Sequence, residues 1–291
     1  MDWLITILEQ GLIYGILGLG VYITYKILDF PDLTVDGSFP LGAAITAMLI
    51  VNGVNPYITL IVSAFVGALA GICTGLIHVK LKVRDLLSGI IMMTALWSIN
   101  LYIAGTSNVP LFANDTIFKN EMIEKIFKGN SISTLIIIIV IALIAKILLD
   151  LYLRTKSGYL LRAVGDNPKL VTSLAKDEGN VKILGLSISN ALVALAGSLF
   201  AQEQRVFEIS MGTGAIVIGL ASVIIGTSIF KNITFIKATT AVMVGSILYK
   251  LSVAIAIKEF EPQSMKLITA ILFLVILVIS MDRKKKVKKN A

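Results

Sequence analysis

Two carboxylates stand in a short polar stretch, Asp32-Leu-Thr-Val-Asp36-Gly-Ser38, between a long apolar segment and a short one. A broken helix that opens within a membrane protein often presents such groups along a transport route. The alternative is a solvated turn in which Asp36 or Ser38 caps the next helix. Both interpretations stay open here, and Asp32, Thr34, Asp36 and Ser38 are candidate residues for the route.

Further polar side chains lie inside apolar sequence, notably Trp97, Asn100 and Asn190. In a membrane, such groups are more often hydrogen-bond partners between helices than contacts for a solute. We keep these three residues as additional route candidates, with interhelical bonding as the alternative.

Enzyme signatures are missing from the chain. It contains no Gly-x-x-x-x-Gly-Lys-Ser/Thr nucleotide loop, nucleophile elbow or zinc helix. His78 is the only histidine and has no cluster of acidic or Cys residues beside it, so we expect no metal site. The deep parts of the apolar segments carry few ionisable residues, which disfavours an ion-coupled carrier with a proton relay. We therefore expect a non-enzymatic chain without a cofactor of its own.

The composition indicates the class of protein to which these residues belong. Of 291 residues, 56% are hydrophobic and 15% are charged, whereas soluble domains carry roughly 25% charged residues. The net charge of +8 then indicates basic cytoplasmic loops rather than nucleic-acid binding. Cys73 is expected to be a small buried residue. The sequence therefore predicts a single all-α, polytopic membrane domain, residues 1–291.

Nine apolar segments are predicted, and the second is too short to cross a bilayer alone. A helix from about Ser38 to Val51 is about 20 Å long, against a hydrocarbon core of about 30 Å. Placing the N-terminus outside and the C-terminus in the cytoplasm puts most Lys and Arg residues inside, including a basic tail over 282–291. The segments are Trp3–Ile27, Phe39–Val51, Pro56–Val79, Leu86–Ala104, Ile132–Leu153, Val181–Ala201, Ala215–Phe230, Ile233–Ile257 and Met265–Met281.

A second polar stretch, residues 157–179, lies on the cytoplasmic side in this topology. Asp166 or Asn167 can cap a helix that has Pro168 at its first position. Leu170, Val171 and Leu174 then share one face of this short helix, which must dock on a partner.

Two other features concern packing. Gly67, Gly71 and Gly75 recur every fourth residue, which favours close helix packing within the subunit over a dimer seam. The apolar residues of the outer loop, 106–130, suggest that it lies on the lipid surface or meets an external partner.

The chain resembles the permease subunit of ABC importers of the branched-chain amino acid and ribose type, from about Asp32 to Leu251. The resemblance rests on the stretch 32–38 before Leu41-Gly-Ala-Ala44, and on the glycine ladder leading into Lys80-Leu-Lys-Val. It also rests on Arg162-Ala-Val-Gly-Asp-Asn-Pro168 before Ala191-Leu-Val-Ala-Leu-Ala-Gly197, and on Gly219-Leu-Ala-Ser-Val-Ile-Ile-Gly-Thr227. One departure is Ala175-Lys-Asp-Glu-Gly179, where family members usually carry Gly-Ile.

The resemblance implies a coupling helix that contacts a separate cytoplasmic ATPase. Its expected residues are Arg162, Gly165, Asp166, Asn167, Pro168, Leu170, Val171 and Leu174. ATP and Mg would bind to that ATPase, and an extracytoplasmic solute-binding protein, free or lipid-anchored, would deliver the solute. The expected setting is a homodimer in a bacterial plasma membrane.

The resemblance also suggests the solute. The most similar subgroup takes up aromatic amino acids such as tryptophan or tyrosine. A permease for a sugar or nucleoside, an ion-coupled secondary transporter, and a membrane scaffold or receptor are the alternatives.

Overall fold

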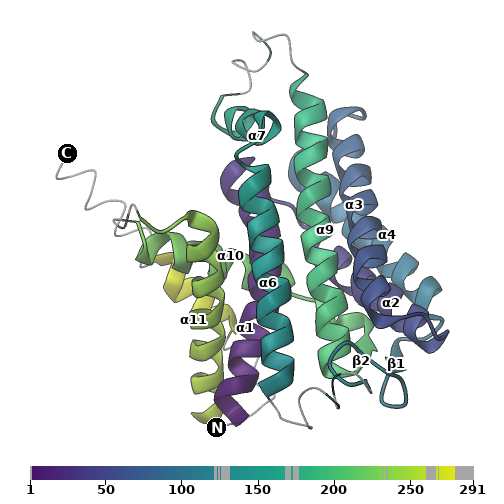
Figure 1. Cartoon of the computed structure of the whole chain (residues 1–291). Helices are drawn as coiled ribbons and strands as arrows, with labels where there is room; N and C mark the ends of the chain where they lie inside the picture. Colours follow the sequence, from purple (N-terminus) through teal and green to yellow (C-terminus); the bar gives the residue numbers. More distant parts are fainter. Residues whose placement is uncertain are drawn as a thin grey trace.

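The computed structural model describes residues 2–120, 123, 125, 132–167, 172, 177–231, 233, 235–259, 267 and 269–278. Figure 1 shows a helical bundle with the N-terminus near two short strands at one end and helix α7 at the other. The elements are α1 (Asp2–Val21), the π-helix η1 (Tyr22–Ile27), α2 (Val35–Val51), α3 (Pro56–Val79), α4 (Asp85–Ala104), β1 (Asn108–Pro110), α6 (Ile132–Tyr152), α7 (Lys156–Asp166), α9 (Glu178–Gln204), β2 (Val206–Glu208), the 3-10 helix η2 (Ile209–Gly212), α10 (Ala215–Ile229) and α11 (Ala238–Glu259).

The prediction of a mostly helical, membrane-spanning chain is confirmed. Within the described ranges, seven helices are long and apolar enough to cross a membrane, and they match seven of the nine predicted segments. The second and ninth segments match the shorter apolar helices Val35–Val51 and Thr269–Val278. Crossing by these two, and the placement of the termini, stay predictions.

Helix α2 differs from its prediction at its N-terminus. It begins at Val35 rather than near Ser38, so Asp36 lies in its first turn and Ser38 inside it. Neither residue caps α2, which corrects the capped-turn interpretation. With 17 residues, α2 is about 25 Å long, still short of the roughly 30 Å hydrocarbon core.

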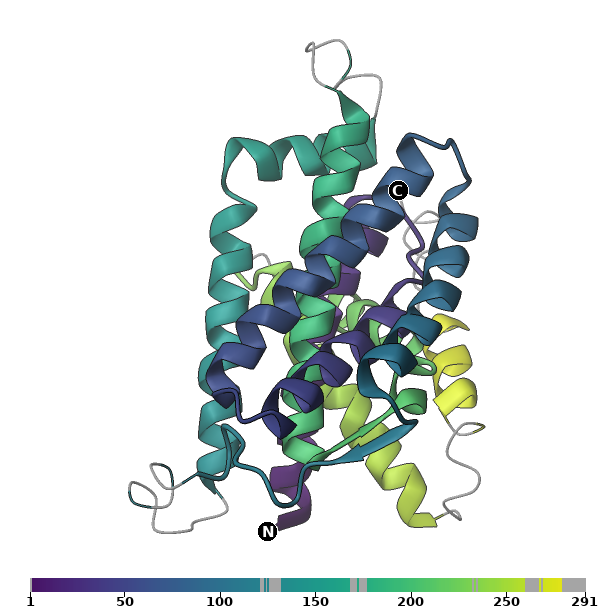
Figure 2. The same cartoon turned by 90° about the vertical axis from the view of Figure 1, so that its right-hand side faces the viewer.

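The glycine ladder packs against another helix of the same subunit, as predicted, and the structure shows that this helix is α9. A Cβ atom at Gly71 would lie 2.2 Å from the Leu186 carbonyl oxygen, and one at Gly67 would lie 2.4 Å from that of Asn190. Figure 2 shows α3 lying obliquely across α9. The contact therefore requires small residues on α3, because the two backbones touch.

Part of the loop 106–130 packs onto the bundle, and its predicted contact with lipid or an external partner stays a prediction. β1 pairs antiparallel with β2, so the chain is not purely α-helical. Ile117 is fully buried and Phe118 is 8% exposed. The side-chain oxygen of Gln202 accepts a hydrogen bond from the Ile117 backbone N–H at 3.0 Å.

The coupling motif and Cys73 differ from their predictions. Residues 162–166 belong to α7, which ends at Asp166 with Asn167 as its C-cap, so the polar motif closes a helix. Pro168, Leu170, Val171, Leu174 and the tail 282–291 lie outside the described residues. Cys73 is exposed, and the prediction of its burial is wrong.

The α3–α9 contact generates a stability prediction. Gly71→Val would force the backbones apart, since overpacking of this kind typically costs about 1–3 kcal/mol. We expect a lower melting temperature of the detergent-purified protein and a lower yield. Cys73→Val, on the exposed face of the same helix, is the matched control and should leave both unchanged. Equal stability of the two variants would contradict the backbone contact.

Candidate functional site

A pocket of about 350 Å³ opens beside α2 and α4. Its walls are formed by Asp36, Gly37, Pro40, Met93, Thr94, Trp97, Asn100 and Thr213. Three predicted route residues, Asp36, Trp97 and Asn100, therefore meet in one place although they come from two helices. The Trp97 side chain is 45% exposed, which leaves an indole face available beside the pocket.

Asp36 holds the start of helix α10. Its carboxylate accepts hydrogen bonds from the backbone N–H groups of Gly214 at 3.0 Å and Ile216 at 2.8 Å. Gly214 has φ +83°, a conformation that favours glycine. The partial positive charge of a helix N-terminus stabilises a carboxylate placed there. Asp36 is therefore a helix cap, but for α10 rather than for its own helix.

Asn100 presents a buried acceptor in the pocket wall. Its Nδ2 donates a hydrogen bond to the Gly37 carbonyl oxygen at 3.1 Å. Its Oδ1 is buried and has no hydrogen-bond partner in the part of the chain that the structure describes. Leaving a buried acceptor unpaired costs roughly 1–3 kcal/mol. A donor group on a bound molecule or a water could satisfy it.

The other four route candidates form a separate, buried network. Asn190 Nδ2 donates to Asp32 Oδ2 at 2.8 Å, and Ser38 Oγ donates to Asn190 Oδ1 at 2.7 Å. The Thr34 backbone N–H donates to Asp32 Oδ1 at 3.0 Å, and the Thr34 hydroxyl lies 2.9 Å from that of Thr74. All four candidates are buried, so this network fastens α2 to α9 and does not line the pocket.

The network is linked to α7 through η1. The Leu28 N–H donates to the Ile23 carbonyl, five residues earlier, and such π-turns often mark functional positions. A Cβ atom at Gly165 of α7 would lie 1.7 Å from the Ile27 carbonyl oxygen. The predicted coupling residue Gly165 therefore lies against the segment that leads directly to Asp32. Arg162, Asp166 and Asn167 are exposed.

Several features of the site are missed by sequence reasoning. Thr94 and Thr213 line the pocket, and nothing in their local sequence singles them out. Gly212-Thr-Gly214 before an apolar run is a turn signal that could have indicated the start of α10. The expectation of few charges inside the bundle was also too strong. Glu9 is 7% exposed, and Lys250 Nζ lies 3.9 Å from the centroid of the Tyr14 ring.

Comparison with known proteins adds the family. The family model described as branched-chain amino acid transport system / permease component matches residues 3–280. A tyrosine transport system permease protein of Clostridioides difficile (strain R20291) is 45% identical, covering 95% of this chain and 91% of that protein. An uncharacterized protein of Rickettsia prowazekii (strain Madrid E) is 34% identical, covering 94% and 96%. A probable branched-chain amino acid transport permease protein of Methanocaldococcus jannaschii is 28% identical, covering 73% and 70%.

The buried network predicts a stability loss for Asn190→Ala. The change removes the amide partner of both Asp32 and Ser38, and each unpaired buried group typically costs about 1–3 kcal/mol. We expect a clearly lower melting temperature in detergent. Asn180→Ala, at an exposed position of the same helix, is the control and should not change it. A melting temperature for Asn190→Ala equal to that of the control would show that the network does not stabilise the fold.

Proposed function

Since the chain belongs to the family of branched-chain amino acid transport system permease components, we propose that it carries an aromatic amino acid, tyrosine above all, through the membrane. It is a multi-pass permease of the ABC type, the transport subunit of a system and not itself an enzyme. The pocket formed by Asp36, Trp97 and Asn100 is the observation that carries the solute proposal.

The chemistry of the pocket suits such a solute. The half-exposed indole of Trp97 offers a ring face against which an aromatic side chain can stack. The unpaired Asn100 Oδ1 can accept a hydrogen bond from an ammonium group. The Asp36 carboxylate adds negative charge nearby, although two backbone N–H groups already bind it. The tyrosine permease protein at 45% identity supports the same class of solute.

The assembly that we propose uses both ends of the bundle. A cytoplasmic ATPase, which binds ATP and Mg, docks on α7 and the residues after it, and a solute-binding protein docks at the opposite end near β1 and β2. Basic residues support this orientation. Lys80 follows α3, Arg84 precedes α4, Arg154 follows α6, and Lys26 and Lys156 lie in the last turn of η1 and the first turn of α7, all at the α7 end. Two copies of the permease form the complete pathway, with the pockets facing the partner copy.

Coupling in this proposal runs through α7 and η1. Movement of α7 on ATP binding is transmitted by the contact of Gly165 with the Ile27 backbone, and from there to the Asp32–Asn190 network. Gly185 of α9 closes the same junction, since a Cβ atom there would lie 2.7 Å from Leu28 Cδ1. The junction can act as a rigid link because neither glycine leaves room for a Cβ atom.

Replacement of the pocket indole tests the solute proposal. Trp97→Ala should reduce tyrosine uptake by proteoliposomes that contain permease, ATPase and solute-binding protein by about tenfold or more, since stacking and burial of an aromatic ring are lost. Trp3→Ala removes the only other tryptophan, which is 49% exposed near the N-terminus, and should transport normally. Unchanged uptake in Trp97→Ala would remove the pocket from the solute's path.

Coupling has its own test. Gly165→Val should leave the ATPase bound but uncouple ATP hydrolysis from solute transport, because the added side chain displaces α7 from η1. We expect ATP hydrolysis to continue in the reconstituted complex while uptake falls at least tenfold. Lys156→Val, at an exposed position of the same helix, is the control. Normal uptake per ATP in Gly165→Val would disprove coupling through this contact.

A further inference from the structure

A second cavity, remote from the solute pocket, lies where α6, α7, η1 and the start of α11 meet. It measures about 370 Å³, and its lining includes Tyr22, Asp150, Arg154, Tyr159, Arg162 and Lys237. We refer to it as the basic pocket. Three cationic side chains line it against a single carboxylate, so it carries a net positive charge.

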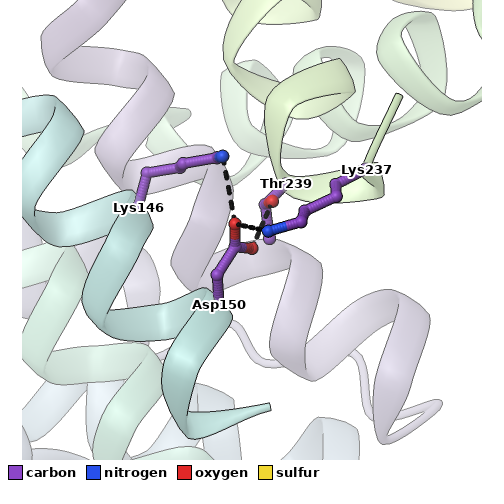
Figure 3. Close-up of polar contacts among 4 residues, drawn as sticks. All are labelled: Lys146, Asp150, Lys237 and Thr239. Carbon is purple, nitrogen blue, oxygen red and sulfur yellow. Dashed lines mark hydrogen bonds and ion pairs between the residues drawn. The ribbon is translucent and has the colours of Figure 1, made fainter. Parts of the chain in front are cut away.

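The carboxylate of Asp150 binds three donors from the protein (Figure 3). Lys146 Nζ lies 3.0 Å and Lys237 Nζ 2.9 Å from its Oδ2, and the Thr239 hydroxyl donates to Oδ1 at 2.6 Å. This cluster joins α6 to the start of α11. Because two ammonium groups already surround Asp150, it has little capacity left to neutralise the arginines of the same pocket.

Arg154 and Arg162 are the two cationic groups of the basic pocket that Asp150 does not pair with. Both side chains are exposed, and within the described part of the chain the ion pairs are those of Asp150 with the two lysines. A guanidinium presents its N–H donors in a planar fork that matches the oxygens of a phosphate. The hydroxyls of Tyr22 and Tyr159 supply neutral donors in the same cavity. The lining is therefore chemically suited to a phosphate group.

The depth of the basic pocket identifies the kind of phosphate. Asp150 lies in the last turn of α6, and Lys237 directly precedes α11, so the cavity sits where two spanning helices leave the apolar zone. Lipid headgroups occupy this level. The exposed side of α6 carries Leu151 at the level of the cavity, and Ile147 and Leu143 one and two turns further into the apolar zone; these residues are 56%, 51% and 52% exposed. An acyl chain can follow this apolar stripe while its headgroup enters the pocket.

We propose that the basic pocket binds the phosphate headgroup of an anionic phospholipid, with Arg154 and Arg162 as its principal ligands and Lys237 contributing charge. Basic cavities between membrane helices are well suited to such headgroups. A bound lipid would connect α6, α7 and α11 at the end of the bundle that carries the coupling contact. The proposal does not depend on the identity of the solute or on the ATPase, so it can fail without the transport proposal failing.

Lipid binding can be measured directly on the purified full-length permease. After delipidation, dioctanoyl phosphatidylglycerol, dioctanoyl phosphatidylcholine and inorganic phosphate would be titrated separately, with native mass spectrometry and thermal shift as readouts. We expect phosphatidylglycerol to bind and to raise the melting temperature, and the other two to have much weaker effects. Arg154→Gln/Arg162→Gln should weaken phosphatidylglycerol binding about tenfold or more.

The matched control is Lys80→Gln/Arg84→Gln. It removes two exposed cations at the same end of the bundle, since Val79, next to Lys80, lies against Gly179 at the start of α9. This control should bind phosphatidylglycerol as the wild type does. Gel filtration and the lipid-free melting temperature check that both double variants are folded. Equal loss in both variants would mean that only the total basic charge matters.

Three other results would also overturn the proposal. Equal binding of phosphatidylcholine would remove the selectivity for anionic lipid, and an equal effect of inorganic phosphate would make the cavity a site for the free anion. The third is normal lipid binding by Arg154→Gln/Arg162→Gln combined with loss of the ATPase on co-purification. That result would assign the two arginines to an acidic surface of the ATPase.

Discussion

Close approach of three helix backbones to helix α9 is the constraint on which the structure depends. Carbonyl oxygens of Leu186, Ser189, Asn190 and Ala194 each face a glycine of another helix, and a Cβ atom there would lie 1.9–2.6 Å away. These glycines are Gly20, Gly42, Gly67 and Gly71, from α1, α2 and α3. Lipid is as apolar as the side chains, so such close packing, rather than the hydrophobic effect, holds membrane helices together.

The polar groups follow from this arrangement. Because α2 crosses close to α9, Asn190 reaches Asp32 and Ser38 together, and the carboxylate is buried with its hydrogen bonds satisfied. Asp36, four residues further along, points away toward α10. One short stretch thus supplies both a structural attachment to α9 and part of the wall of the pocket beside α2 and α4. The spacing of these residues in the sequence does not show which of them has which role.

Much of the fold could be predicted because hydrophobic length is a strong signal. Pro56–Val79 is a helix with the predicted bounds, and the glycine spacing indicated its partner face. The start of α2 could not be predicted, since Asp36 resembles a local cap and its true partners, Gly214 and Ile216, are remote in sequence. The pocket likewise depends on α2 and α4 lying together. The exposure of Cys73 follows from the same glycine spacing, because residue 73 lies on the side of α3 opposite Gly71 and Gly75. Its burial was wrongly expected because the residue type alone was considered.

The carboxylate of Asp36 belongs to two structures at once: it lines the pocket beside α2 and α4, and it caps the N-terminus of helix α10. Any displacement of α10 along its axis must either carry this carboxylate with it or break two hydrogen bonds. The shape of the pocket and the position of α10 are therefore thermodynamically linked. Linkage is reciprocal, so a molecule in the pocket that prefers one position of Asp36 selects the corresponding position of α10 with the same free energy.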